Sequence, residues 1–162
     1  MSTMMPFILA AAIAAISGGA SGQSVISQRN LSFDGAREMA LGALEACRKK
    51  GYAVSVTVLD RGGRTRVALH DDNANPHTIE NSLRKAYTAL TFRGPSEQLA
   101  KRAACNPSVL NLANVITGGG GLPVYEGKDI VGSIGVSGAP GPDLDAPCAQ
   151  AGIDRAMKAQ GK

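Results

Sequence analysis

Residues 53–70 read AVSVTVLDRGGRTRVALH, two strand-like runs joined by a short turn. In the first run Val54, Val56 and Val58 alternate with small polar residues, which is the period of an extended strand. The turn, residues 60–63, contains a Gly-Gly pair, and the chain then returns through a second apolar run. This pattern predicts a β-hairpin, and therefore an antiparallel sheet at the centre of the protein.

Helical patterns lie on both sides of this hairpin. Ser32 stands where an N-cap belongs, helical spacing continues to about Lys50, and Gly51 follows where a C-terminal cap is expected. A second helix is predicted after the hairpin, capped by Asn75 and opened by Pro76. The predicted buried stripe of this helix consists of Ile79, Leu83, Ala86 and Leu90.

The last third of the chain predicts a second hairpin. Short helices are expected between residues 96 and 113, and a tetraglycine, residues 118–121, leads into a hairpin over residues 122–136. A final helix is predicted over residues 143–159. The order helix, hairpin, helices, hairpin, helix predicts one α+β domain, with an antiparallel sheet of about four or five strands flanked by helices.

Size and charge limit the possible classes of function. The chain has 162 residues, of which 44% are hydrophobic and 19% charged, the profile of one globular domain. The formal net charge is only +4 and the lysines and arginines are scattered. Nucleic-acid binding favours a basic stripe with stacking aromatics, so we expect no nucleic-acid partner.

The N-terminus is typical of a secretory signal. Residues 4–16 form an unbroken apolar run that is too short to span a bilayer, and the small residues 17–22 supply a small-x-small cleavage pattern. No Lys or Arg precedes the run, and a disordered or membrane-anchored N-terminus is the alternative. We expect a signal peptide over residues 1–22, a domain over residues 23–162, and a periplasmic or secreted protein.

Export changes the interpretation of the three cysteines. Cys47, Cys105 and Cys148 fit no zinc-ligand spacing. In an oxidising compartment two of them can pair and leave one free, and the sequence does not select the pair. The alternative is that all three are small buried residues.

Few residues are candidates for chemistry. The tetraglycine offers bare N–H groups that suit a phosphate or carboxylate, or it is simply a turn into a strand. His70 and His77 are the two histidines, and each is either a surface residue or an axial ligand of haem iron. Arg84, Lys85 and Arg93 can face an anionic ligand. No nucleophile–base pair is recognisable, so no catalytic residue is assigned.

Several motifs together resemble one family. Residues 56–63 are similar to its hydrophobic strand ending in Asp-x-x-Gly, and residues 84–89 to its Lys-Ala-x-Thr-Ala helix. Residues 118–138 are similar to its Gly-Gly-x-Pro and Gly-x-Ile-Gly-Val-Ser-Gly motifs, and residues 145–149 resemble its closing Asp-x-x-Cys-Ala. In this order, over residues 31 to about 157, the chain resembles the GlcG/HbpS haem-binding family.

The resemblance implies a profilin-like fold, homo-oligomers and non-covalent haem. We expect haem in a cleft between the second helix and the glycine loop, with His77 as the iron ligand. Both a Thr and a His have been proposed for that role in the family; the Thr of the shared motif is Thr88, and Thr78 heads the same helix. Lys85 and the backbone of Gly119 and Gly120 are predicted near the haem propionates.

Three functions follow as hypotheses. The first is an exported protein that binds haem or a similar small anionic ligand, in haem or iron capture or in sensing. The second is an enzyme that acts on a small organic acid or on haem itself. The third is an interaction module for a membrane sensor or an exported oxidoreductase.

Overall fold

A computed structural model describes residues 24–160, so the predicted signal peptide lies outside the described residues. The elements follow the predicted order of helix, hairpin, helices, hairpin and helix. They are α1 (Phe33–Arg48), β1 (Ser55–Asp60), β2 (Thr65–His70), α2 (His77–Phe92), α3 (Gln98–Cys105), the 3-10 helix η1 (Pro107–Asn111), β3 (Gly121–Glu126), β4 (Asp129–Ser137) and α4 (Pro142–Gln160). Within this described range, no helix has the length and apolar character needed to cross a membrane.

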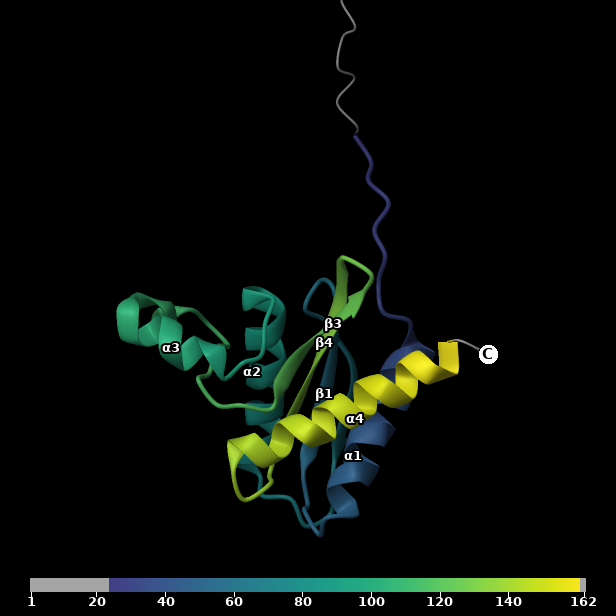
Figure 1. The fold of residues 1–162 in the computed structure, drawn as a ribbon, viewed down its shortest axis with the longest axis vertical. Coiled ribbons are helices and arrows are strands. Elements are labelled where there is room, and N and C mark those ends of the chain that lie inside the picture. Colours follow the sequence, from purple (N-terminus) through teal and green to yellow (C-terminus); the bar gives the residue numbers. More distant parts are fainter. Residues whose placement is uncertain (1–23, 161–162) are drawn as a thin grey trace, which may run out of the picture.

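The four strands form one antiparallel sheet in the order β2–β1–β4–β3. Each predicted hairpin supplies one central and one edge strand, and the two central strands, β1 and β4, pair along the whole of β1. Helices lie on both sides of the sheet (Figure 1), and every residue of β1 is buried. The predicted α+β class, with its helix-flanked antiparallel sheet, is confirmed.

One face of the sheet carries the hydrophobic core. Val56 and Val58 of β1 pack with residues of α1 and α4, which lie side by side (Figure 1) and contribute mostly alanines. Cys47 of α1 and Cys148 of α4 form a disulfide across a sequence separation of 101. The sequence left this pairing open; the third cysteine, Cys105, is free and exposed.

The opposite face of the sheet is covered by α2 through small and polar residues. The expected stripe is wrong in part, because Ile79 is 53% exposed and Leu83 and Leu90 are only half-buried. The strands beneath α2 present hydroxyls and Gly135, where a side chain would collide with the helix backbone. The helix therefore turns a different face to the sheet. Its buried residues are Thr78, Ser82, Lys85, Ala86, Thr88 and Ala89.

The N-terminus of α2 differs from the expectation in detail, whereas the helix ends at Phe92 as predicted. No side chain caps the N-terminus, and Asn75 instead accepts through its carbonyl from the N–H of Thr78 at 3.0 Å. The helix starts at His77, one residue later than predicted, because Pro76 occupies the N-cap position. At the other end the left-handed residue is Arg93, with φ 54° and ψ 38°. This conformation favours glycine, so an arginine there is unusual.

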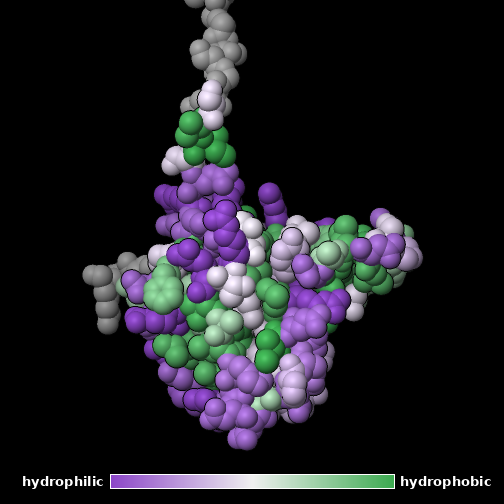
Figure 2. Space-filling model, turned by 180° about the vertical axis from the view of Figure 1, so that it is seen from behind, coloured by the Kyte–Doolittle hydropathy of each residue, from purple (hydrophilic) through white to green (hydrophobic). Residues whose placement is uncertain are grey.

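A short arm protrudes beyond α2. It consists of α3 and η1, which pack on each other and are anchored by the buried Leu99. Figure 2 shows hydrophobic surface on this part of the molecule, and Leu110 of η1 is 49% exposed. We call these two elements the α3–η1 arm.

Candidate functional site

Paired hydroxyl groups fill the interface between α2 and the sheet. The Oγ atom of Ser55 lies 2.7 Å from Oγ1 of Thr78, and Oγ1 of Thr57 lies 2.8 Å from Oγ of Ser82. All four side chains are buried. Each pair satisfies polar groups that are costly to bury alone, and together the pairs fix α2 over β1.

A chain of hydrogen bonds leads from this interface to His70. Thr78 donates its hydroxyl proton to the carbonyl of Asn75 at 2.6 Å, so toward Ser55 it accepts. Ser55 therefore donates to Thr78, and it accepts from Nδ1 of His70 at 2.7 Å. The Nδ1 atom consequently carries a proton. In the neutral imidazole this leaves the lone pair on Nε2 of an exposed residue.

An open groove separates α2 from the edge strand β2. It exists because α2 packs on β1, β4 and β3 and leaves this face of β2 uncovered. His70 follows Ala68 by two residues, so both lie on the same face of the strand. The groove has a volume of about 480 Å³ and is lined by Thr57, Thr65, Ala68, Pro76, Ile79, Glu80 and Leu83. We call it the α2–β2 groove.

Lys85 lies inside the packed protein. Its Nζ donates to Oδ2 of Asp145 at 2.7 Å and to the carbonyl of Val136 at 3.1 Å, and both charged side chains are buried. The N–H of Ala139 donates to the other oxygen of Asp145. Burial raises the pKa of the Asp145 carboxyl, against the opposing effect of Lys85. Because the ammonium is already paired, the predicted contact with a propionate requires this ion pair to open.

The tetraglycine packs against this ion pair. Gly120 has a φ of 106°, and a side chain there would meet the carbonyl of Val136 and Cβ of Asp145. A side chain on Gly119 would meet the carbonyl of Pro142. Close packing therefore accounts for both glycines, and their contact with a propionate stays a prediction.

The loop before the glycines is hydrogen-bonded to α2. Oγ1 of the buried Thr88 accepts from the N–H of Ile116 at 2.9 Å, and Arg84 donates to the carbonyl of Val115 at 2.6 Å. Thr88 thus has a structural partner, and its role as an iron ligand stays a prediction.

The structure brings together only part of the predicted site. Lys85, Thr88 and the glycine loop, including Gly119 and Gly120, meet on one side of α2. His77 is exposed at the first residue of the helix, eight residues before Lys85 and therefore about 12 Å away along the axis. Packed atoms lie where a cleft was expected between α2 and the glycine loop.

Sequence reasoning missed the residues that order this region. Asp145 reads as a first-turn acid of the last helix, 60 residues from the Lys85 that it pairs with. Ser55 reads as an ordinary strand residue, and Thr78 reads only as the threonine at the head of the second helix. A signal for Ser55 was present, because a hydroxyl between the valines of a buried strand needs a partner on the opposite layer.

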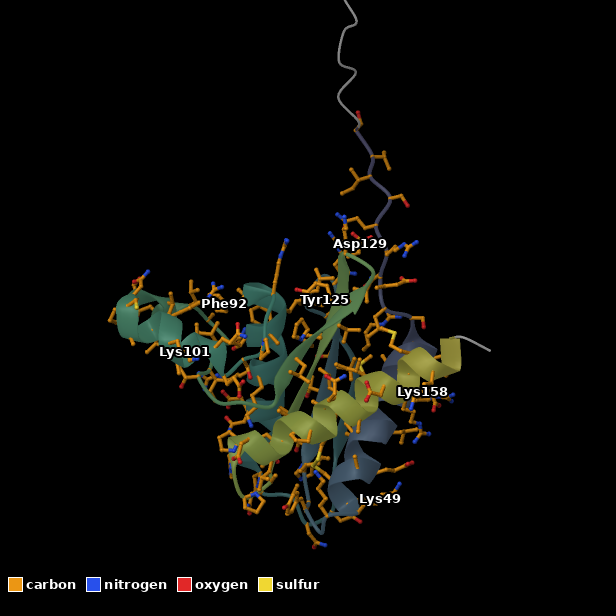
Figure 3. The ribbon with its side chains drawn as sticks, in the orientation of Figure 1. Lys49, Phe92, Lys101, Tyr125, Asp129 and Lys158 are labelled. Atoms are coloured by element: carbon orange, nitrogen blue, oxygen red, sulfur yellow. A yellow bond between two sulfur atoms is a disulfide. The ribbon has the colours of Figure 1, made fainter. Side chains whose placement is uncertain are left out.

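A second cavity lies where α2 meets the α3–η1 arm. It measures about 470 Å³, and its lining includes Phe92 and Lys101, whose positions Figure 3 shows, together with Arg102 and Cys105. The guanidinium of Arg102 lies 5.3 Å from the centre of the Phe92 ring. Neither histidine lines this cavity. No group of three or more His, Cys, Asp or Glu side chains between residues 24 and 160 could hold a metal ion.

The fold defines the class: a single α+β domain in which helices enclose a four-stranded antiparallel sheet. The family described as "Haem degrading protein HbpS-like" matches residues 31–154. The chain belongs to this HbpS-like family, and the resemblance seen in its motifs is confirmed.

Solved structures and a curated relative agree with this assignment. A double mutant of HbpS from Streptomyces reticuli has a TM-score of 0.79 and 38% identity, covering 90% of this chain and 97% of that chain. PduOC, solved as a haem complex, has a TM-score of 0.72 and 23% identity, covering 78% and 94%, and this likeness shows the fold alone. An uncharacterised 15.0 kDa protein of Citrobacter freundii is 30% identical over 113 residues, 67% of this chain and 80% of that protein.

Proposed function

We propose that this protein binds haem non-covalently in the α2–β2 groove, with His70 as the iron ligand. The observation that carries the proposal is the hydrogen-bond chain that holds a proton on Nδ1 of His70 and leaves Nε2 as the base. Metal-ligating histidines characteristically donate their other ring N–H to a protein acceptor, and a neutral imidazole suits haem iron. Membership of a family described as haem degrading supports the same ligand.

The α2–β2 groove, whose lining residue Ala68 precedes His70 by two residues on the same face of β2, suits a flat and largely apolar ligand. Ala68, Ile79 and Leu83 supply apolar walls to the groove. Ile79 is 53% exposed, so a ligand in the groove would remove its apolar surface from water. Arg66 is exposed on the same strand and is the cation that we propose for a propionate.

The assignment of the iron to His77 is the competing proposal. His77 is exposed at the start of α2, and a site built on it would use the other side of the helix, with Lys85, Thr88, Gly119 and Gly120. That version requires the packed glycine loop to move and the Lys85–Asp145 pair to open. The two proposals therefore differ in the iron ligand, which is His70 in the first and His77 in the second.

Haemin titration of the purified chain, followed at the Soret band, tests the proposal. We expect saturation near one haem per chain. His70→Ala should shift the Soret maximum, and Ser55→Ala should weaken binding by about tenfold, the lower range for loss of an outer-shell partner. His77→Ala is the matched control and should leave the spectrum unchanged.

Two results would change the conclusion. A shifted spectrum in His77→Ala together with an unchanged one in His70→Ala would move the iron to His77. No saturable shift in the unmodified chain would overturn haem binding itself, and a screen of small anionic ligands would then be the next step.

Haem degradation is a second candidate function, favoured by the description of the family. It predicts that ascorbate bleaches the Soret band of the bound haem faster than that of haem on albumin. A band that survives ascorbate at the albumin rate would leave binding, in capture or in sensing, as the function.

We also propose that the protein is exported to the periplasm or beyond the cell. The Cys47–Cys148 disulfide supports this, because such bonds persist in oxidising compartments, and so does the apolar run of residues 4–16. Cell fractionation and N-terminal sequencing test it. Export predicts a mature chain that begins near residue 23, whereas an intact N-terminus in the cytoplasm would contradict it.

We also propose that the protein forms a homo-oligomer and that it binds a protein partner. Leu110 of η1 and the nearby Leu112, 49% and 50% exposed, offer apolar surface that a homo-oligomer would cover, and light scattering would measure the oligomer. A membrane sensor or an exported enzyme is the proposed class of partner. Co-purification with the products of neighbouring genes tests that class, and recovery of the protein alone would argue against it.

A further inference from the structure

A third cavity lies where the β1–β2 turn meets the C-terminal half of α2. It has a volume of about 270 Å³. Arg61 reaches it from the turn and Arg93 from the end of the helix. Its walls also include Tyr87, Leu90, Thr91 and Ile130, residues that carry apolar surface and hydroxyl groups.

The two guanidinium groups have no acidic partner. Every ion pair found between residues 24 and 160 uses other cations, and no Asp or Glu lines the cavity. Arg61 donates to the carbonyl of Ile130 at 3.1 Å, which orients its side chain. The adjacent Asp60 accepts from the N–H groups of Gly62 and Arg64, at 2.8 and 3.0 Å, so its carboxylate stabilises the β1–β2 turn.

Arg93 is held in a conformation that disfavours an arginine. It lies in the left-handed region, with φ 54°, although glycine is the usual residue there and Gly94 follows immediately. Its carbonyl accepts from the hydroxyl of Tyr125 at 2.9 Å, which fixes the backbone further. Unfavourable backbone conformations of this kind cluster at binding sites, where the side chain is needed.

We propose that this cavity binds a small organic dicarboxylate. A guanidinium forms two parallel hydrogen bonds with a carboxylate, so Arg61 and Arg93 suit the two acid groups of one ligand. Thr91 and Tyr87 offer hydroxyl groups, and Leu90 and Ile130 offer apolar surface to the carbon chain. The cavity is large enough for carbon atoms between the two acid groups.

This site is separate from the proposed haem site. The dicarboxylate cavity and the α2–β2 groove share no lining residue, and His70 lies seven residues beyond Gly63, which is roughly 20 Å of extended chain. The inference therefore goes beyond the proposed function and does not depend on it. Haemin titration of the Arg93 variants should match the unmodified chain.

Calorimetric titration of the purified chain with succinate, at physiological salt, is the test. We expect saturable binding of one succinate per chain, with butyrate, which has one carboxylate, at least about tenfold weaker. Arg61→Gln and Arg93→Gly should each weaken succinate binding by about tenfold or more. Arg64→Gln, in the same turn but outside the cavity, is the matched control and should bind normally.

The Arg93→Gly variant separates a binding role from a folding role. Glycine adopts φ 54° without strain, so this variant should melt at the same temperature as the unmodified chain or higher while it loses succinate. Equal losses in Arg64→Gln would overturn the proposal, since they indicate general basicity. Tighter binding of inorganic phosphate than of succinate, or no saturable binding, would overturn it as well.

Discussion

Breaking the Cys47–Cys148 disulfide should remove a large part of the stability of this protein. The bond joins α1 to α4 across a sequence separation of 101, so the loop that it closes contains the whole sheet. The bond acts mainly by restricting the unfolded chain, and the chain-entropy relation for such a loop gives about 4.7 kcal/mol at 25 °C. Domains have a total stability of only about 5–15 kcal/mol, so this loss can unfold a large fraction of the molecules.

The double variant Cys47→Ser/Cys148→Ser tests this value, with Cys105→Ser as the control because Cys105 is free and exposed. Urea denaturation should show a free energy of unfolding lower by about 3–5 kcal/mol in the double variant and unchanged in the control. The m-value should rise, because an unfolded chain without the cross-link exposes more surface. A loss below about 1 kcal/mol with an unchanged m-value would refute the reasoning.

Three further predictions concern packing and charge. Asp145→Asn should lower the free energy of unfolding by about 3–5 kcal/mol, because it leaves the Lys85 charge buried without its partner; Lys85→Met combined with Asp145→Leu should cost much less in the same urea measurement. Gly135→Ala should cost about 3 kcal/mol, seen as a lower melting temperature, because its methyl group would collide with the backbone of α2. The Arg48 guanidinium, through its hydrogen bond and charge, holds the pKa of the Asp71 carboxyl below its usual value. The Asp71 carboxylate therefore stabilises the folded protein above pH about 3.9, the pKa of Asp in the unfolded chain. This stabilisation is lost as the pH falls through the lower pKa of Asp71 in the folded protein. Arg48→Gln should therefore flatten the acid side of the stability curve, and an unchanged curve would contradict the pairing.

The order of the elements could be predicted because its signals are local. The valine alternation of residues 54–58 and the Gly-Gly turn predict the first hairpin from neighbouring residues alone. Gly51 has a φ of 78°, as its predicted place after the first helix requires. Such positions are determined within a few residues, so the fold class followed from the sequence.

The buried face of α2 could not be predicted in the same way. Ile79 and Leu83 are apolar and have the spacing of a buried stripe, whereas Thr78 and Ser82 have the same spacing but are polar. The opposite layer decides the outcome, because β1 presents hydroxyls that require hydroxyl partners. The pairing of Lys85 with Asp145 could not be predicted for a related reason, because only tertiary folding brings these two residues together.

The paired hydroxyls hold α2 at a single position on the sheet. Apolar contacts are non-directional, so a helix held by leucines can slide by part of a turn and regain most of its burial. A slide of half a turn, about 2.7 Å, would leave Ser55, Thr57 and their helix partners buried without hydrogen bonds, at about 1–3 kcal/mol for each group. Any ligand that displaces α2 must release both pairs, and Ser55 is then free to donate to Nδ1 of His70 instead of accepting from it. The position of α2 is therefore coupled to the tautomer of His70 through Ser55.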